Sequence, residues 1–258
     1  MAHTVLLGND TWYRAPKGRG TPIVLLHGGL SSSAGIWRSV GKRLARRSPV
    51  EVFDRRGHGR SADTGDDFSY SAMADETVAF LEFLGRPCHL LGYSDGGIIA
   101  LLVAMRRPDL VGRLILVGAN FDVDGLHPLP PMTTTGPEYE SWAARYASES
   151  PMGSTGALSA FERGRELFDR EPHLSVADIA TVQAPALVLV GDDDVVRVEH
   201  TVELFEALPE AQLAVIPGAS HAVLKEHTDV CVRLIRRFLK MELPPVTYQP
   251  VRRRPAQP

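Results

Sequence analysis

The chain has 258 residues, of which 44% are hydrophobic and 23% are charged, and its formal net charge is −3. This composition is ordinary for a globular protein and supplies enough apolar side chains for a sizeable core. A net charge so close to zero creates no strong field toward nucleic acid or an anionic membrane, so we expect neither as a partner.

Membrane insertion and export are not expected. The longest apolar stretch, residues 98–105, is far shorter than the roughly 20 residues that a spanning helix needs. The N-terminus, MAHTVLLGND, has no basic segment followed by an apolar one, which argues against a signal peptide. Cys88 and Cys231 have neither metal-like nor redox-like spacing, which fits a reducing compartment. We therefore predict a cytoplasmic protein.

Short apolar runs alternate with amphipathic stretches along most of the chain. This alternation is typical of βαβ units and predicts an α/β fold: a mostly parallel sheet with helices on both faces. We expect strands at 23–26, 50–53, 88–91, 114–117, 186–190 and 213–216, and helices at 70–84, 97–106 and 223–239. Pro108 is expected to stop the second of these helices.

Residues 120–180 break the alternation. They carry several prolines and then aromatic side chains spread over helical segments. A structureless insertion of this length is unusual unless it is functional, so we interpret 120–180 as an inserted helical lid over a site. The alternative is a surface loop with two helices. The core then comprises residues 1–119 and 181–243, and the proline-rich tail 244–258, with three arginines at 252–254, is predicted to be disordered.

The strongest local signal is the hexapeptide GYSDGG at 92–97, which follows an expected strand and opens an expected helix. A G-x-S-x-G pattern in this setting is typical of a tight, strained turn that exposes a nucleophilic serine, here Ser94. Gly92 and Gly96 let neighbouring backbone pass closely. The first N–H groups of the helix point at any oxyanion that forms there. The alternative is a glycine-rich turn without a catalytic role.

A serine hydroxyl is a poor nucleophile at neutral pH and needs a base. His221 is the candidate because it follows the last expected strand, at the edge where sites in open α/β sheets collect. The alternative is an ordinary surface histidine. His27 and His58 are rivals, but each lies in a glycine-rich turn and is expected to shape its loop.

An acid that orients the histidine should follow the strand at 186–190. Three carboxylates stand there in succession, Asp192, Asp193 and Asp194.

These motifs resemble the α/β-hydrolase superfamily over nearly the whole chain. The segment DRRGHGRS at 54–61 also looks like that family's D-x-R-G-x-G-x-S loop. The resemblance implies the chain order serine, acid, histidine. Because the family pattern is G-x-x-D with the acid last, it selects Asp194, with Asp192 as the second choice.

The same resemblance places an oxyanion hole in the segment HGGL at 27–30. It implies that the backbone N–H of Gly29 or Leu30 joins the N–H of Asp95. Within the superfamily, the hexapeptide followed by GAN at 118–120 resembles the biphenyl-hydrolase-like, or valacyclovir hydrolase, group, although the lid does not match it. That group includes an amino-acid ester hydrolase whose acid after the nucleophile binds the substrate ammonium, which implies this role for Asp95. The alternative is that Asp95 is a helix N-terminal acid.

The sequence therefore predicts an enzyme, a serine hydrolase that cleaves a small carboxylic ester or lactone through an acyl-enzyme, with no cofactor and no metal. The same triad would serve a carbon–carbon or thioester hydrolase, and the same pocket a cofactor-free lyase or oxygenase, or a receptor. Dehalogenases and epoxide hydrolases of this fold are disfavoured, because their nucleophile is a carboxylate where this chain has Ser94.

Substrate contacts are expected from Asp95 and from the lid residues Trp142, Tyr146 and Phe161, since ligand pockets are largely apolar. The alternative is that these three aromatic side chains form the core of the lid.

Overall fold

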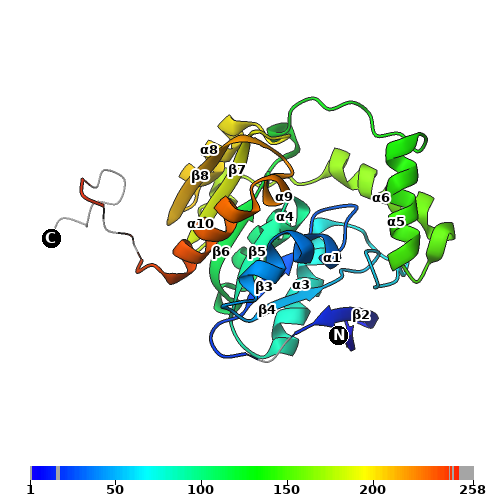
Figure 1. Ribbon diagram of the computed structural model, residues 1–258, viewed down its shortest axis with the longest axis horizontal. Coiled ribbons are helices and arrows are strands. Elements are labelled where there is room, and N and C mark those ends of the chain that lie inside the picture. Colours follow the sequence, from blue (N-terminus) through cyan, green and yellow to red (C-terminus); the bar gives the residue numbers. More distant parts are fainter. Residues whose placement is uncertain (1, 16–17, 244, 246, 250–258) are drawn as a thin grey trace.

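The computed structural model describes residues 2–15, 18–243, 245 and 247–249 (Figure 1). Within this part of the chain, eight strands form one sheet in the order β1-β2-β4-β3-β5-β6-β7-β8. The pairs β1–β2 and β2–β4 are antiparallel and the others are parallel. The strands are β1 (Ala2–Leu6), β2 (Asn9–Arg14), β3 (Ile23–Leu26), β4 (Val50–Phe53), β5 (Cys88–Tyr93), β6 (Val111–Val117), β7 (Ala186–Asp193) and β8 (Ala211–Ser220).

The helices alternate with the parallel strands. They are α1 (Ser33–Ile36), α2 (Lys42–Leu44), α3 (Tyr70–Leu84), α4 (Asp95–Arg106), α5 (Pro137–Glu149), α6 (Ala157–Arg170), α7 (Val176–Ile179), α8 (Val198–Ala207), α9 (Val223–Glu226) and α10 (Thr228–Lys240). A π-helical turn, Trp37–Gly41, joins α1 to α2. Among the described residues, none of these helices is long and apolar enough to cross a membrane.

Two apolar clusters lie on opposite faces of the sheet, because successive side chains of a strand point to opposite sides. In β3, Val24 and Leu26 join the cluster that includes side chains of α3, α4 and α8, whereas Ile23 and Leu25 join the cluster of α1, α2, α9 and α10. All four are buried, which explains why this central strand is apolar throughout. The predicted α/β fold, with helices on both faces of a mostly parallel sheet, is confirmed.

The segment 120–180 contributes no strand to the sheet within the described residues. Figure 1 shows its helices α5 and α6 beside each other at one end of the molecule, away from the helices that cover the sheet. Their facing sides form a small apolar cluster of their own around Trp142, Tyr146 and Phe161. This placement suits a lid.

The structure corrects one predicted element. The single helix expected over 223–239 is interrupted at His227, whose backbone leaves the helical region with φ −119° and ψ 41°. The Thr228 hydroxyl donates to the carbonyl of Leu224 at 2.8 Å and so helps to end α9. Strands β1 and β2 and helices α1, α2 and α8 were not anticipated. Most of the predicted tail 244–258, including the arginines at 252–254, lies outside the described residues.

Candidate active site

Ser94, Asp194 and His221 each stand directly after a parallel strand: β5, β7 and β8 respectively. Parallel strands end at the same edge of a sheet, so the fold gathers all three side chains there. Ser94 itself adopts φ 53° and ψ −123°, a conformation that residues with a side chain rarely take. Its amide donates to the carbonyl of Val117 on β6 at 2.9 Å. The strained turn between β5 and α4 therefore lifts the hydroxyl above the sheet.

The glycines of this turn are required by close backbone approach. A Cβ atom on Gly92 would lie 2.1 Å from the carbonyl oxygen of Gly96, and one on Gly96 would lie 2.2 Å from the carbonyl oxygen of Leu26. Both obstacles are backbone atoms that cannot rotate away. The tight turn therefore depends on these two residues.

We expect Gly96→Ala to lower the free energy of unfolding by about 1–3 kcal/mol or more, because the added methyl group must displace the end of β3. Urea denaturation measures the loss. Gly35→Ala is the matched control, since the nearest atom to its new Cβ is the movable Ser31 hydroxyl at 3.0 Å and Gly35 lies in a helix, where alanine is favoured. Equal stability of the two variants would contradict the steric argument.

The three side chains form a continuous chain of contacts. His221 Nε2 lies 3.1 Å from Ser94 Oγ, and His221 Nδ1 lies 2.7 Å from Asp194 Oδ1. The Asp194 side chain is fully buried and its Oδ1 also accepts the amide of Val196 at 3.0 Å, while the His221 side chain is 26% exposed. Gly118 makes room for the pair, because a Cβ there would lie about 3 Å from the His221 ring. The arrangement can move a proton between Ser94 and His221 while a carboxylate holds the ring.

The competing carboxylates of the same loop lie elsewhere. Asp192 and Asp193 are exposed, and Asp192 Oδ1 accepts the amide of Ala219 at 3.2 Å. Among the described residues, Asp194 is the one of the three aspartates whose carboxylate lies within hydrogen-bond distance of the His221 ring. The geometry therefore favours Asp194 as the orienting acid.

The rival histidines shape loops, as expected. His27 Nδ1 lies 2.8 Å from the carbonyl oxygen of Gly28, and His58 Nδ1 lies 3.1 Å from the carbonyl oxygen of Arg56. Burial, helped by the nearby Arg55 cation, lowers the pKa of His27 well below its ordinary value and that of His58 to about 3. Both rings are therefore neutral near pH 7 and packed into the protein.

The loop after β3, residues 27–31, which we call the oxyanion loop, is fastened to the core by Arg55. This buried guanidinium donates to the carbonyl of His27 at 2.7 Å and to that of Gly28 at 3.4 Å. Sequence reasoning identified the loop at 54–61 only by resemblance. Its arginine serves the site by fixing the backbone beside Ser94.

Asp95 is 4% exposed, so its carboxylate is an interior charge. Burial raises the pKa of the Asp95 carboxyl, and the Arg55 cation and a hydrogen bond with Tyr70 oppose that rise. The carboxylate faces the oxyanion loop, since a Cβ on Gly29 would lie 2.4 Å from Asp95 Oδ2. The Asp95 side chain therefore already interacts with the Arg55 cation and with the Tyr70 hydroxyl within the protein.

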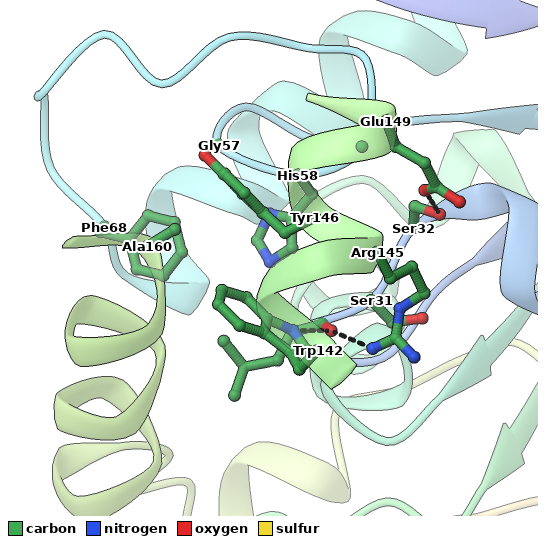
Figure 2. A pocket seen from close by; sticks show the side chains of 12 residues that line it. Ser31, Ser32, Gly57, His58, Phe68, Trp142, Arg145, Tyr146, Glu149 and Ala160 are labelled. Carbon is green, nitrogen blue, oxygen red and sulfur yellow. Dashed lines mark hydrogen bonds between the residues drawn. The ribbon is translucent and has the colours of Figure 1, made fainter. Parts of the chain in front are cut away.

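The lid aromatics predicted to bind substrate pack on one another. Trp142 and Phe161 rings meet edge to face at 5.1 Å, and Trp142 and Tyr146 stack at 5.3 Å. Figure 2 shows Trp142 and Tyr146 lining a pocket between α5 and the oxyanion loop, whereas Phe161 is not among its lining residues. The three side chains therefore form a buried cluster between α5 and α6, and their contact with substrate stays a prediction.

Phe168 of α6 was not chosen from the sequence, yet its ring lies against Gly29: a Cβ on Gly29 would come within 2.4 Å of it. The only sequence signal was its place among the aromatics of 120–180. Phe168 is thus a side chain of the inserted helices that the structure brings to the oxyanion loop beside Asp95.

Comparison with known proteins agrees with this geometry. Residues 23–234 match the model of the alpha/beta hydrolase family. The chain belongs to that family. It is therefore an enzyme of the hydrolase class, as predicted. Among the described residues, no cluster of His, Cys, Asp and Glu could hold a metal ion.

Several relatives are similar over most of their length. A protein assigned as the carbamate hydrolase RutD of Pseudomonas savastanoi pv. phaseolicola is 29% identical, over 78% of this chain and 87% of its own. A meta-cleavage product hydrolase, CumD, has a TM-score of 0.76 and 25% identity over 92% of this chain and 97% of its own. Est816, described as an N-acyl homoserine lactone degrading enzyme, has a TM-score of 0.72 and 26% identity over 92% of this chain and 100% of its own.

Proposed function

We propose that this hydrolase cleaves a small carboxylic ester or lactone through an acyl-enzyme formed on Ser94. One observation carries the proposal: the Ser94–His221–Asp194 chain of contacts at 3.1 and 2.7 Å, placed on a strained strand-to-helix turn. A serine so placed has a base within reach of its proton, which is the requirement for a nucleophile at neutral pH.

In the proposed reaction, Ser94 Oγ attacks the substrate carbonyl while His221 Nε2 takes its proton. Asp194 accepts a hydrogen bond from the Nδ1–H group, fixes the tautomer and stabilises the imidazolium that forms. His221 then returns the proton to the leaving alcohol, which leaves an acyl group on Ser94. A water molecule, deprotonated by His221, attacks this ester, and collapse of the second tetrahedral intermediate releases the acid and restores the serine.

The proposed oxyanion donors are the backbone N–H groups of Asp95, at the start of α4, and of Gly29. A trans peptide points its C=O and N–H in opposite directions. The Gly28 carbonyl is turned to the buried Arg55 and His27 side chains, so the N–H of Gly29 is held on the other side of the same peptide. This geometry supports the N–H of Gly29 as the donor from the oxyanion loop.

A small substrate agrees with the volume of a cavity near Ser94 and with the activity described for a similar protein. A cavity of about 450 Å³ is lined by Gly28 of the oxyanion loop and by Tyr93 and Ala222, which are the chain neighbours of Ser94 and His221. This volume lies within the range of small-molecule pockets. Est816 acts on a lactone by its description, which supports the ester or lactone class for this chain. We also propose that the enzyme is cytoplasmic, because Cys88 and Cys231 have neither metal-like nor redox-like spacing, which fits a reducing compartment.

The test is a substrate panel of p-nitrophenyl acetate, an N-acyl homoserine lactone, a p-nitrophenyl carbamate and a ring-cleavage dienoate. We expect turnover of the first two, with a burst of p-nitrophenol from the acetate and an acyl adduct on Ser94 found by mass spectrometry. Turnover of the dienoate alone would instead assign the carbon–carbon hydrolase function suggested by the likeness to CumD. No adduct and no turnover would refute the proposal.

Ammonium binding by Asp95 is tested by comparing an α-amino ester with its N-acetyl form. Since Arg55 already supplies a cation near the buried carboxylate, we expect the wild type to hydrolyse the two esters at similar rates. A strong preference for the free amine that disappears in Asp95→Asn would show that the carboxylate does bind the substrate ammonium.

A further inference from the structure

We propose that Trp142 of α5 is a positioning residue for the oxyanion hole, through the hydrogen bond that it makes to the backbone of Leu30. The inference rests on the proposed function, since it assigns to the inserted helices the task of holding the loop that stabilises the oxyanion. Neither the indole nor the Leu30 carbonyl takes part in the chemistry.

The hydrogen bond from Trp142 to the Leu30 carbonyl is short, and the Arg145 guanidinium approaches the same oxygen only at a longer distance. Trp142 Nε1 donates to the carbonyl oxygen of Leu30 at 2.7 Å, and the Arg145 guanidinium lies 3.5 Å from the same oxygen (Figure 2). An indole nitrogen is a donor only, and a buried donor without a partner is unfavourable. Trp142 is 9% exposed, so its N–H depends on this carbonyl.

Leu30 has a backbone conformation that needs such a restraint. Its φ is 47°, in the left-handed region that residues other than glycine, asparagine and aspartate rarely adopt. Such a conformation persists only where surrounding contacts impose it. A change in the φ of Leu30 rotates the Gly29–Leu30 peptide, which is joined through the Gly29 Cα atom to the peptide that carries the Gly29 N–H, so relaxation of Leu30 would shift the proposed oxyanion donor.

The oxyanion loop is therefore held from two sides. Arg55 fixes the carbonyls of His27 and Gly28 from the core, and Trp142 fixes that of Leu30 from the lid. Gly29 lies between the two restraints. The inserted helices thus support the backbone beside the nucleophile.

Two further contacts join the same loop region to α5 and α6. The Ser32 hydroxyl donates to Glu149 Oε2 at 2.5 Å. The Leu30 side chain packs against Gly164 so closely that a Cβ there would lie 2.7 Å from Leu30 Cδ2. The lid and the oxyanion loop are therefore complementary in shape as well as in hydrogen bonding, and displacement of the lid must disturb Leu30.

The direct test is Trp142→Phe, which keeps a ring against Tyr146 and Phe161 but removes the N–H donor. Loss of a true oxyanion donor costs about 10²–10³ in kcat, and small misplacement of catalytic groups about 10². We expect kcat on p-nitrophenyl acetate to fall about 10- to 100-fold while KM changes less than about twofold. The rate of Ser94 labelling by a fluorophosphonate should fall in parallel, since its phosphoryl oxygen occupies the same hole.

Tyr139→Phe is the matched control, because Tyr139 packs on the same aromatic cluster and should leave both rates unchanged. A raised KM with unchanged kcat in Trp142→Phe would make Trp142 a substrate-contacting residue and overturn the inference. Unchanged kcat and labelling would also overturn it. If wild-type Ser94 is not labelled at all, the proposed function itself fails, so the two failures are distinguishable.

Trp142→Leu replaces Trp142→Phe if that variant does not fold. Leucine keeps an apolar side chain in the cluster with Tyr146 and Phe161 but has no donor for the Leu30 carbonyl. A fall in kcat and in labelling rate at constant KM would support the inference, and wild-type values of both rates would overturn it.

Discussion

Replacing Ser94 with alanine should lower kcat on p-nitrophenyl acetate by a factor on the order of 10⁶, the loss seen when a nucleophile is removed from a serine hydrolase triad. The Ser94 hydroxyl is the group placed for attack on the substrate. Its oxygen lies 3.1 Å from His221 Nε2, and its backbone lies on the strained turn between β5 and α4. Labelling by a fluorophosphonate should be abolished as well.

Stability should be little affected by Ser94→Ala, since the strained backbone is held by the Val117 contact and by the glycines rather than by the hydroxyl. Ser148→Ala is a suitable control, because its exposed hydroxyl donates to the carbonyl of Arg145 at 2.7 Å within α5. Retention of turnover by Ser94→Ala, or stoichiometric labelling of another residue, would mean that the nucleophile lies elsewhere.

The central elements were predictable because their sequence signals are local. Strand β3 is apolar at every position because both of its faces are covered, and its predicted bounds agree with the structure. Helix α3 has apolar residues at helical spacing between the cap Ser69, which accepts the amide of Ala72, and Gly85 at φ 68°. The serine turn was recognisable because its backbone requires glycine at positions 92 and 96, and both glycines are visible in the sequence.

The missed elements have weak local signals. Strands β1 and β2 form an antiparallel pair at one edge of the sheet, and their polar, partly exposed residues show no apolar run. Helix α1 begins in a stretch rich in serine and glycine, which are poor helix formers. The break at His227 arises within an otherwise continuous amphipathic pattern, so periodicity alone predicted one helix.

The motifs of the candidate site were predictable from the sequence, but the contacts that hold its loops in place were not. The contacts of Arg55 with the oxyanion loop, of Phe168 with Gly29 and of Trp142 with Leu30 join residues that are far apart in the chain. Nothing in the spacing of these residues predicts that they meet, since the meeting depends on how the inserted helices return to the sheet edge. Such contacts become visible only once the fold is assembled.

A single substitution at Asp194 or Asp192 distinguishes which of the two carboxylates orients His221. The sequence places three aspartates in succession and the residues themselves do not rank them. In the structure Asp194 is buried and lies 2.7 Å from His221 Nδ1, whereas Asp192 is exposed and accepts the amide of Ala219. A negative charge acts on the imidazolium most strongly where water is excluded.

We therefore expect Asp194→Asn to lower kcat by a factor on the order of 10⁴, as in other triads, and Asp192→Asn by only a few-fold. Asparagine fills nearly the same volume and its amide oxygen can still accept a hydrogen bond from the Nδ1–H group, but it carries no charge to stabilise the imidazolium formed when Ser94 is deprotonated. Steady-state kinetics with p-nitrophenyl acetate measures both variants, and circular dichroism establishes that each is folded. The opposite ranking of the two losses would make Asp192 the orienting acid, in which case His221 would have to turn away from the contact with Asp194 during catalysis.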